Sequence, residues 1–113
     1  MGLSDKTTLA VLAELARTIE ERSREDADAS YTASLLNNGI DSCAKKFGEE
    51  AVELILASAS KNTAHTTAEA ADVLYHFLVL LQASGVSVDD VMEELSRRQG
   101  TSGHVEKAAR KKD

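Results

Sequence analysis

The amino-acid sequence predicts an all-α protein, a bundle of about four to five helices. None of the 113 residues is proline, the residue that most strongly breaks helices. The hydrophobic residues are mainly helix formers, with 17 Ala and 13 Leu against 11 Val plus Ile. Apolar residues also recur at intervals of three and four along several segments, as they do on the buried face of a helix.

A length of 113 residues fits one domain. We expect this domain to cover residues 1–100 and a polar tail, basic at its end, to cover residues 101–113. A chain this short buries only a modest core, so self-association is expected.

The first helix is predicted from Thr8 to about Arg24. Its apolar residues follow the helical spacing and are Leu9, Leu12, Leu15, Ala16 and Ile19. A short second helix is expected over residues 31–36. It should end at residues 37–39, the run Asn-Asn-Gly, because these residue types tolerate the left-handed backbone of a helix end.

Asp41 is predicted to cap a second long helix that runs to about Ser60. Residues at helical spacing that should face the core are Ala44, Phe47, Ala51, Ile55 and Ala59. Gly48 inside this helix costs about 1 kcal/mol relative to Ala. We therefore expect a neighbouring helix or a ligand to approach closely at that position.

The run from Thr66 to Glu69 has the capping-box pattern, which predicts a helix over residues 67–84 that ends at Gly85. Ser87 is then expected to cap a last helix that ends near Gly100. The residues of this last helix expected to face inward are Val88, Val91, Met92 and Leu95.

The second half of the helix over 67–84 is apolar on nearly every side, from Val73 to Leu81. A small monomer cannot cover such a helix all round. The sequence therefore predicts a homodimer or a higher homo-oligomer.

Charge, hydropathy and cysteine content exclude several classes of partner and setting. A formal charge of -6 disfavours binding to a phosphate backbone, so no nucleic-acid partner is expected. The apolar runs are too short for a membrane span, and no membrane partner is expected. The single cysteine, Cys43, has no partner for an internal disulfide and is predicted to be a small buried hydrophobe in a cytoplasmic protein.

Two pairs of acids have i, i+3 spacing, Glu50 with Glu53 and Glu69 with Asp72. This spacing places both carboxylates of a pair on one helical face. The fifteen residues between the pairs are enough to turn the chain into an antiparallel helix. Four carboxylates can then converge, and Mg²⁺ is the usual cation for such oxygen ligands beside a phosphate substrate.

A solvated acidic face is the alternative interpretation. Glu49, Glu50 and Glu53 fall roughly opposite the expected apolar face of their helix, and Glu69 can be a capping-box residue. Asp72 argues against it, because it interrupts a surface that is otherwise being buried, and buried carboxylates need a partner.

Three longer runs carry a resemblance to a known family. They are SYTASLL at 30–36, KKFGEEAVE at 45–53 and EAADVLYH at 69–76, and shorter matches follow at 97–100 and 102–104. Together they resemble phosphoribosyl-ATP pyrophosphohydrolase of histidine biosynthesis. The resemblance implies a MazG-like all-α nucleoside triphosphate pyrophosphohydrolase that uses Mg²⁺. It also implies hydrolysis of phosphoribosyl-ATP to phosphoribosyl-AMP and pyrophosphate.

The same resemblance implies roles for individual residues. The metal ligands would be Glu50, Glu53, Glu69 and Asp72. Glu49 would orient or deprotonate the attacking water, although a ligand such as Glu50 could do this instead. Lys45 and Lys46 would meet the polyphosphate, although Lys46 could simply pair with Glu50 one turn away.

Other predicted substrate contacts are Tyr31, Ser34, His76 and Arg97. Ordinary helix capping also accounts for Ser30 at the start of the short second helix. His76 could be a satisfied histidine at a helix interface, and Arg97 could lie on a solvated helix end.

Two other functions remain open on the sequence. One is a house-cleaning pyrophosphatase with the same fold and metal site but other nucleoside triphosphates as substrates. The other is a non-catalytic helical oligomerisation module whose acids form only a solvated face.

Overall fold

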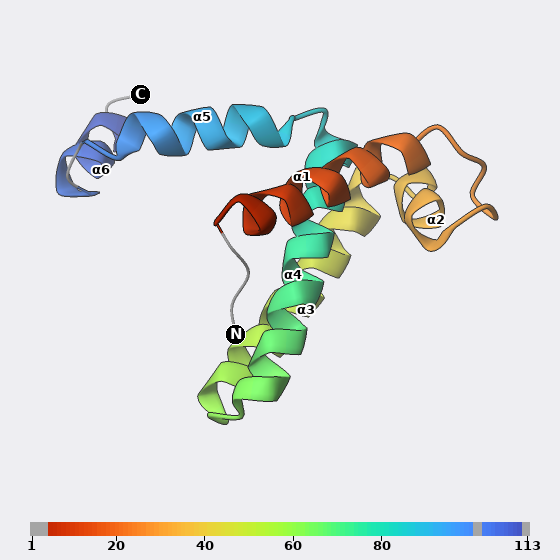
Figure 1. The fold of residues 1–113 in the computed structure, drawn as a ribbon, viewed down its shortest axis with the longest axis horizontal. Helices are drawn as coiled ribbons and strands as arrows, with labels where there is room; N and C mark the ends of the chain where they lie inside the picture. The colour runs from red at the N-terminus through yellow and green to blue at the C-terminus, as the bar shows by residue number, and fades with distance from the viewer. Residues whose placement is uncertain (1–4, 101–102, 112–113) are drawn as a thin grey trace.

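The computed structural model describes residues 5–100 and 103–111, and these residues form six helices (Figure 1). The prediction of an all-α fold is confirmed over these residues. The helices are α1 (Asp5–Arg22), α2 (Tyr31–Asn37), α3 (Ile40–Ala59), α4 (Thr63–Ser84), α5 (Val88–Arg98) and α6 (Gly103–Lys111).

The two longest helices, α3 and α4, lie side by side as an antiparallel hairpin and form the most extensive helix pair (Figure 1). The α3–α4 connection is residues 60–62. Asn62 caps α4, because its side chain accepts a hydrogen bond from the His65 amide at 3.0 Å. The predicted capping box at Thr66 was therefore wrong, and α4 begins one turn earlier.

Glycines fix two other helix ends. Gly39 has a φ of 94° and is the N-cap of α3, so Asp41 lies in the first turn of this helix instead of capping it. Gly85 ends α4 with a φ of 72°, as predicted, and the Val86 amide bonds back to the Leu81 carbonyl at 3.0 Å. Ser87 caps α5, also as predicted, by accepting from the Asp90 amide at 3.1 Å.

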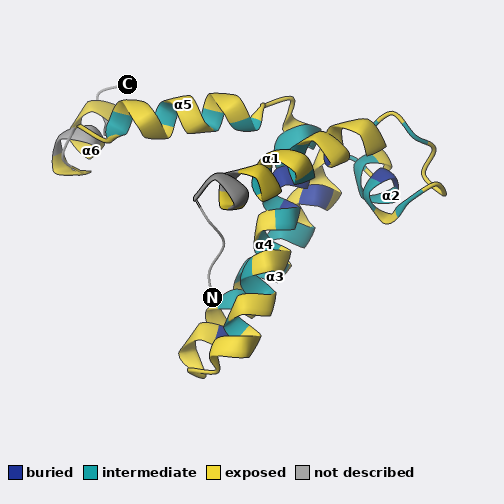
Figure 2. Ribbon diagram, viewed as in Figure 1, coloured by how far each residue is buried: buried dark blue, intermediate teal, exposed yellow. Residues whose placement is uncertain are grey.

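The core lies where α1 crosses the hairpin (Figure 2). Its buried residues are Ile19, Cys43, Leu78 and Val79. The prediction that Cys43 is a buried hydrophobe is confirmed, because this residue is 2% exposed. Its thiol donates a hydrogen bond to the Leu35 carbonyl at 3.3 Å, which ties α3 to α2.

The predicted inward face of α3 was partly wrong. Ile55 is 62% exposed, and Ala44 and Ala59 are exposed as well, whereas Cys43 and Ala57 are buried. The reason is that α3 carries apolar residues on two faces. One face packs on α4, and the other, which includes Val52, Ile55 and Leu56, is exposed.

The helix α5 extends away from the hairpin toward α6 (Figure 1). It contains no buried residue, and Met92 and Leu95 are 40% and 49% exposed. The expectation that its apolar residues face inward was therefore wrong for Met92 and Leu95, whereas Val88 packs against the core.

Residues 103–111 of the predicted tail form α6. Among the described helices, none is by itself long and apolar enough to cross a membrane. The bent pair of α4 and α5 passes that test only when the two helices are taken together.

Candidate functional site

Three carboxylates converge between the two helices of the hairpin. Glu50 comes from the middle of α3, and Glu69 and Asp72 come from α4. One oxygen of each lies within 4.8 Å of an oxygen of the other two. Glu50 and Glu69 are half-buried and Asp72 is exposed. We call these three residues the acidic group.

The local sequence explains why these side chains meet. Glu69 and Asp72 are three residues apart and share one face of α4. Because Asn62 caps α4, Glu69 lies in the second turn of the helix, where it has no capping role. Glu50 lies on the side of α3 that packs on α4, and the prediction that it falls opposite the packed face was wrong.

Two basic side chains lie beside the acidic group. Lys46 Nζ is 3.3 Å from Glu50 Oε1, and His65 Nε2 is 3.3 Å from Glu69 Oε1. The hydrogen bond to Glu50 is the main cause that raises the pKa of Lys46, and Tyr31 and the charge of Glu50 add to it. The sequence reasoning missed His65, although its i, i+4 spacing to Glu69 was a visible signal.

His76 lies buried behind the acidic group, with only 6% of its surface exposed. Burial lowers the pKa of His76, and the carboxylates of Glu50 and Asp72 act against that shift. The imidazole also meets the ring of Tyr75 edge to face, with 4.9 Å between ring centroids. His76 is therefore held at the helix interface near two acids of the group.

Three other predicted residues lie on the exposed surface of α3. Glu49 and Glu53 are exposed and lie outside the acidic group, and Lys45 is exposed too. A Cβ placed on Gly48 would meet no atom within 4 Å. Nothing among the described residues approaches Gly48 closely, so the expected close contact with a neighbouring helix is not made by them.

The two predicted substrate contacts on α2 differ in their exposure to solvent. Ser34 is half-buried on α2, whereas Tyr31 is 59% exposed. Ser30 caps α2 by accepting a hydrogen bond from the Ala33 amide at 3.0 Å, as the capping interpretation predicts.

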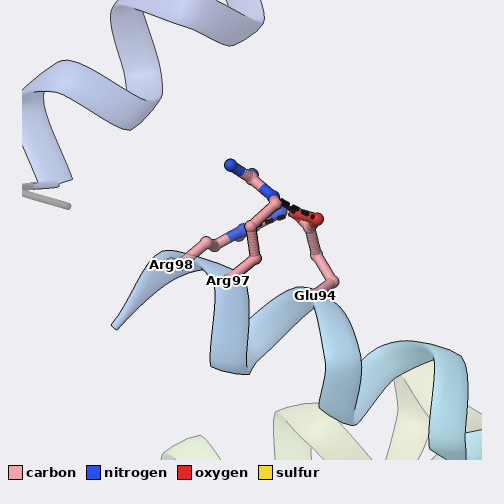
Figure 3. A network of polar contacts seen from close by, with 3 residues as sticks. All are labelled: Glu94, Arg97 and Arg98. Carbon is pink, nitrogen blue, oxygen red and sulfur yellow. Dashed lines mark hydrogen bonds and ion pairs between the residues drawn. The ribbon is translucent and has the colours of Figure 1, made fainter. Parts of the chain in front are cut away.

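Arg97 lies on α5, where it binds the carboxylate of Glu94 with two nitrogens, each 2.8 Å from an oxygen (Figure 3). Arg98 reaches the same carboxylate at 3.1 Å. These hydrogen bonds, first that of Arg97 and then that of Arg98, lower the pKa of Glu94 to about 2. Because α5 extends away from the hairpin, Arg97 is not part of the acidic group (Figure 1).

The acidic group is suited to a divalent cation. It offers three carboxylates from two rigid helices, and carboxylate oxygens are preferred ligands of hard cations. Lys46 supplies one full positive charge, so the three acids are only partly neutralised by the chain. A divalent cation would relieve their mutual repulsion, and the residues present therefore fit such an ion.

A separate groove lies away from the acidic group. It has a volume of about 530 Å³ and opens between α1 and the junction of α4 with α5. Arg17, Gln82 and Val88 are among its lining residues, and no member of the acidic group lines it.

Comparison with known proteins assigns the chain to a family. A profile of phosphoribosyl-ATP pyrophosphohydrolase matches residues 12–99. Phosphoribosyl-ATP pyrophosphatase of Ruegeria pomeroyi is 53% identical over 92% of this chain and 99% of its own length. The enzyme of the same name from Azorhizobium caulinodans is 52% identical over 96% of each chain.

An all-helical fold with carboxylates facing one another across an antiparallel hairpin defines the class, an all-α nucleoside triphosphate pyrophosphohydrolase. Within this class, the chain belongs to the phosphoribosyl-ATP pyrophosphohydrolase family. The family predicted from the three sequence motifs at 30–36, 45–53 and 69–76 is thereby confirmed.

Proposed function

We propose that this protein hydrolyses phosphoribosyl-ATP to phosphoribosyl-AMP and pyrophosphate, the second step of histidine biosynthesis in the cytoplasm. One water is consumed, and one P–O bond of the bridge between the α- and β-phosphates breaks. The observation that carries the proposal is the acidic group, placed between two helices of a chain that is about half identical to enzymes named for this substrate.

Mg²⁺ is the proposed cation of the site. Glu50, Glu69 and Asp72 would hold it, and Glu53 would join them as the fourth ligand that the family pattern implies. When bound, the ion would neutralise charge on the phosphate oxygens. Hydrolysis of a phosphoanhydride depends mainly on such neutralisation and on positioning, which fits a site built almost entirely of carboxylates.

The remaining side chains of the proposed site would bind the substrate and orient the attacking water. Lys46 is fixed by Glu50 and would meet the polyphosphate as a point charge, with Lys45 beside it on the exposed face of α3. Glu49 is the proposed residue that orients the attacking water or accepts its proton. His76 and Ser34 would support the substrate from the α2 side of the site.

Pyrophosphate release from phosphoribosyl-ATP, measured with and without Mg²⁺, tests the activity. We expect release only with the metal and little turnover of ordinary nucleoside triphosphates. Equal turnover of ordinary nucleoside triphosphates without any of phosphoribosyl-ATP would instead identify a house-cleaning pyrophosphatase. No metal-dependent release from any nucleotide would favour a non-catalytic module.

We also infer that a second copy of the chain covers the exposed apolar faces. Three large apolar residues of the outer face of α3 are 52% to 62% exposed, and Leu74 on α4 is 50% exposed. Full burial of such a side chain is worth about 1.5–3 kcal/mol, and roughly half of that remains to be gained at each residue when a partner helix covers it. Arg97 on α5 would then reach a substrate only across this interface or by movement of α5.

Light scattering on the purified protein tests this assembly. We expect a mass of two or more chains, and Ile55→Glu should shift it to that of one chain because a charge would be buried in the interface. Thr18→Glu, at an exposed polar position of α1, is the matched control and should keep the native mass. A wild-type protein that is monomeric would contradict the proposal.

A further inference from the structure

An exposed aromatic ring lies at the edge of the acidic group. Tyr31 is 59% exposed, while the two aromatic side chains that it contacts, Tyr75 and His76, are half-buried and buried. More than half of the surface of Tyr31 is thus open to solvent. Such a ring offers a flat apolar surface with a polar tip.

The ring is held in place by its neighbours. It stacks on Tyr75 with 6.4 Å between centroids and an interplanar angle of 17°, and it meets His76 edge to face. Tyr75 is itself fixed by a hydrogen bond between its hydroxyl and that of Thr32. Tyr31 is therefore preorganised, so a ligand would lose little conformational entropy by binding to it.

The short helix that carries the ring is anchored as well. The Ser30 cap closes its first turn, and Ala33 is fully buried at 0% exposure. These contacts leave Tyr31 on the outer side of a fixed helix.

Tyr31 also borders the residues that would meet the phosphates. It meets His76 edge to face, and His76 lies one turn after Asp72 of the acidic group on α4. Tyr31 is also near enough to Lys46 to help raise the pKa of that lysine, whose Nζ is 3.3 Å from Glu50 Oε1. A nucleotide with its phosphates at the acidic group would thus have an aromatic surface within reach of its base.

We propose that the exposed ring of Tyr31 stacks on the purine base of the nucleotide and makes the site selective for base-bearing substrates. This inference rests on the proposed function and names the surface that recognises the base. Stacking of one base on an aromatic side chain changes affinity by a factor of about 5 to 150.

Calorimetric titration with two ligands separates the contribution of the base to affinity from that of the phosphates. ATP carries both a purine base and phosphates, whereas inorganic triphosphate carries phosphates alone. In the presence of Mg²⁺, Tyr31→Ala should weaken ATP binding by about tenfold and leave triphosphate binding within about twofold of wild type. An equal loss for both ligands would show damage to the phosphate site and overturn the inference.

Two further variants test the ring itself. Tyr31→Phe keeps the aromatic face and should restore ATP binding, while Tyr31→Leu keeps apolar bulk without the ring and should not. ATP binding by Tyr31→Leu as tight as that of wild type would overturn stacking. Val11→Ala, at an exposed position of α1, is the control for loss of a surface apolar group.

Steady-state kinetics should show an effect on KM and little effect on kcat. For phosphoribosyl-ATP, Tyr31→Ala should raise KM by about tenfold with kcat within about threefold. A wild-type protein that releases no pyrophosphate from this substrate would refute the proposed function, whereas the contrast between ATP and triphosphate would still test Tyr31. A variant that binds ATP normally but loses kcat would refute the inference alone.

Discussion

The acidic group of the hairpin and the ion pairs of α5 both contain half-exposed or exposed glutamate, but their countercharges differ. Glu94 receives two arginines from its own helix, which hold its pKa at about 2 (Figure 3). In the described part of the chain, Glu50 pairs with Lys46 and Glu69 pairs with His65, so the three carboxylates of the acidic group have one lysine and one histidine between them. A carboxylate that its own helix neutralises needs nothing further, whereas a cluster left short of positive charge is prepared for an external cation.

The largest effect on activity is expected when a negative charge is removed from the acidic group. Glu50→Gln and Asp72→Asn should each lower kcat/KM for pyrophosphate release by about 100-fold or more, because each keeps its shape but loses a negative ligand. Glu94→Gln, the matched change in the neutralised network, should stay within about threefold of wild type. Similar losses of kcat/KM in all three variants would show that the acidic group and the ion pairs of α5 do not differ in the way proposed.

A second readout for the same variants needs no substrate. Mg²⁺ should raise the melting temperature of the wild-type protein, since a ligand that binds only the folded state stabilises it. Asp72→Asn should reduce this rise and Glu94→Gln should not. A rise that is equal in all proteins would place the ion elsewhere.

A smaller effect is expected beside the acidic group, at Gly48. The space around this residue is open, so Gly48→Ala should stabilise the protein by about 1 kcal/mol through helix propensity. Thermal or urea unfolding measures this change. Destabilisation would show instead that a helix of a second copy approaches the backbone of α3 there, which would be one form of the close helix contact that the sequence predicts at Gly48.

The smallest effect on stability is expected from the ion pairs of α5. The pKa of Glu94 is lowered from 4.5 to about 2 in the folded protein. Its ion pairs are therefore fully present above pH 4.5 and are lost as the pH falls toward 2. Because Glu94 lies on an exposed helix, solvent screens this contribution.

The carboxyl chemical shift of Glu94, followed by NMR against pH, checks this prediction. The wild-type midpoint should lie at about 2. With both Arg97→Ala and Arg98→Ala, the midpoint should move up to the ordinary range of glutamate. An unchanged midpoint would show that the arginines do not hold the charge.

Much of the fold followed from local sequence signals. Gly85 and Ser87 mark their helix ends because a left-handed glycine and a serine cap act within a few residues. The start of α4 was placed too late because Asn62 offers a competing cap four residues before Thr66. Choosing between two local caps depends on how the hairpin closes, which a single segment does not reveal.

The site was harder to predict than the helices. The approach of Glu50 to Glu69 and Asp72 followed from the two i, i+3 spacings and an antiparallel turn. The alternative, which put Glu50 on a solvated face opposite the packed one, was wrong because the outer face of α3 is apolar too. Periodicity finds apolar faces but does not tell which one packs within the chain. The uncovered face of α5 has the same cause.

The connection of residues 60–62 between α3 and α4 also sets the register of the site. Each residue of a helix turns the side chains by about 100° around the axis. One residue inserted between Asn62 and Glu69 would therefore swing Glu69 and Asp72 away from Glu50 while leaving every acid in the chain. The acidic group is thus encoded in a residue count as much as in residue types, and a one-codon insertion there would disrupt the proposed metal site as much as the loss of one of its acids.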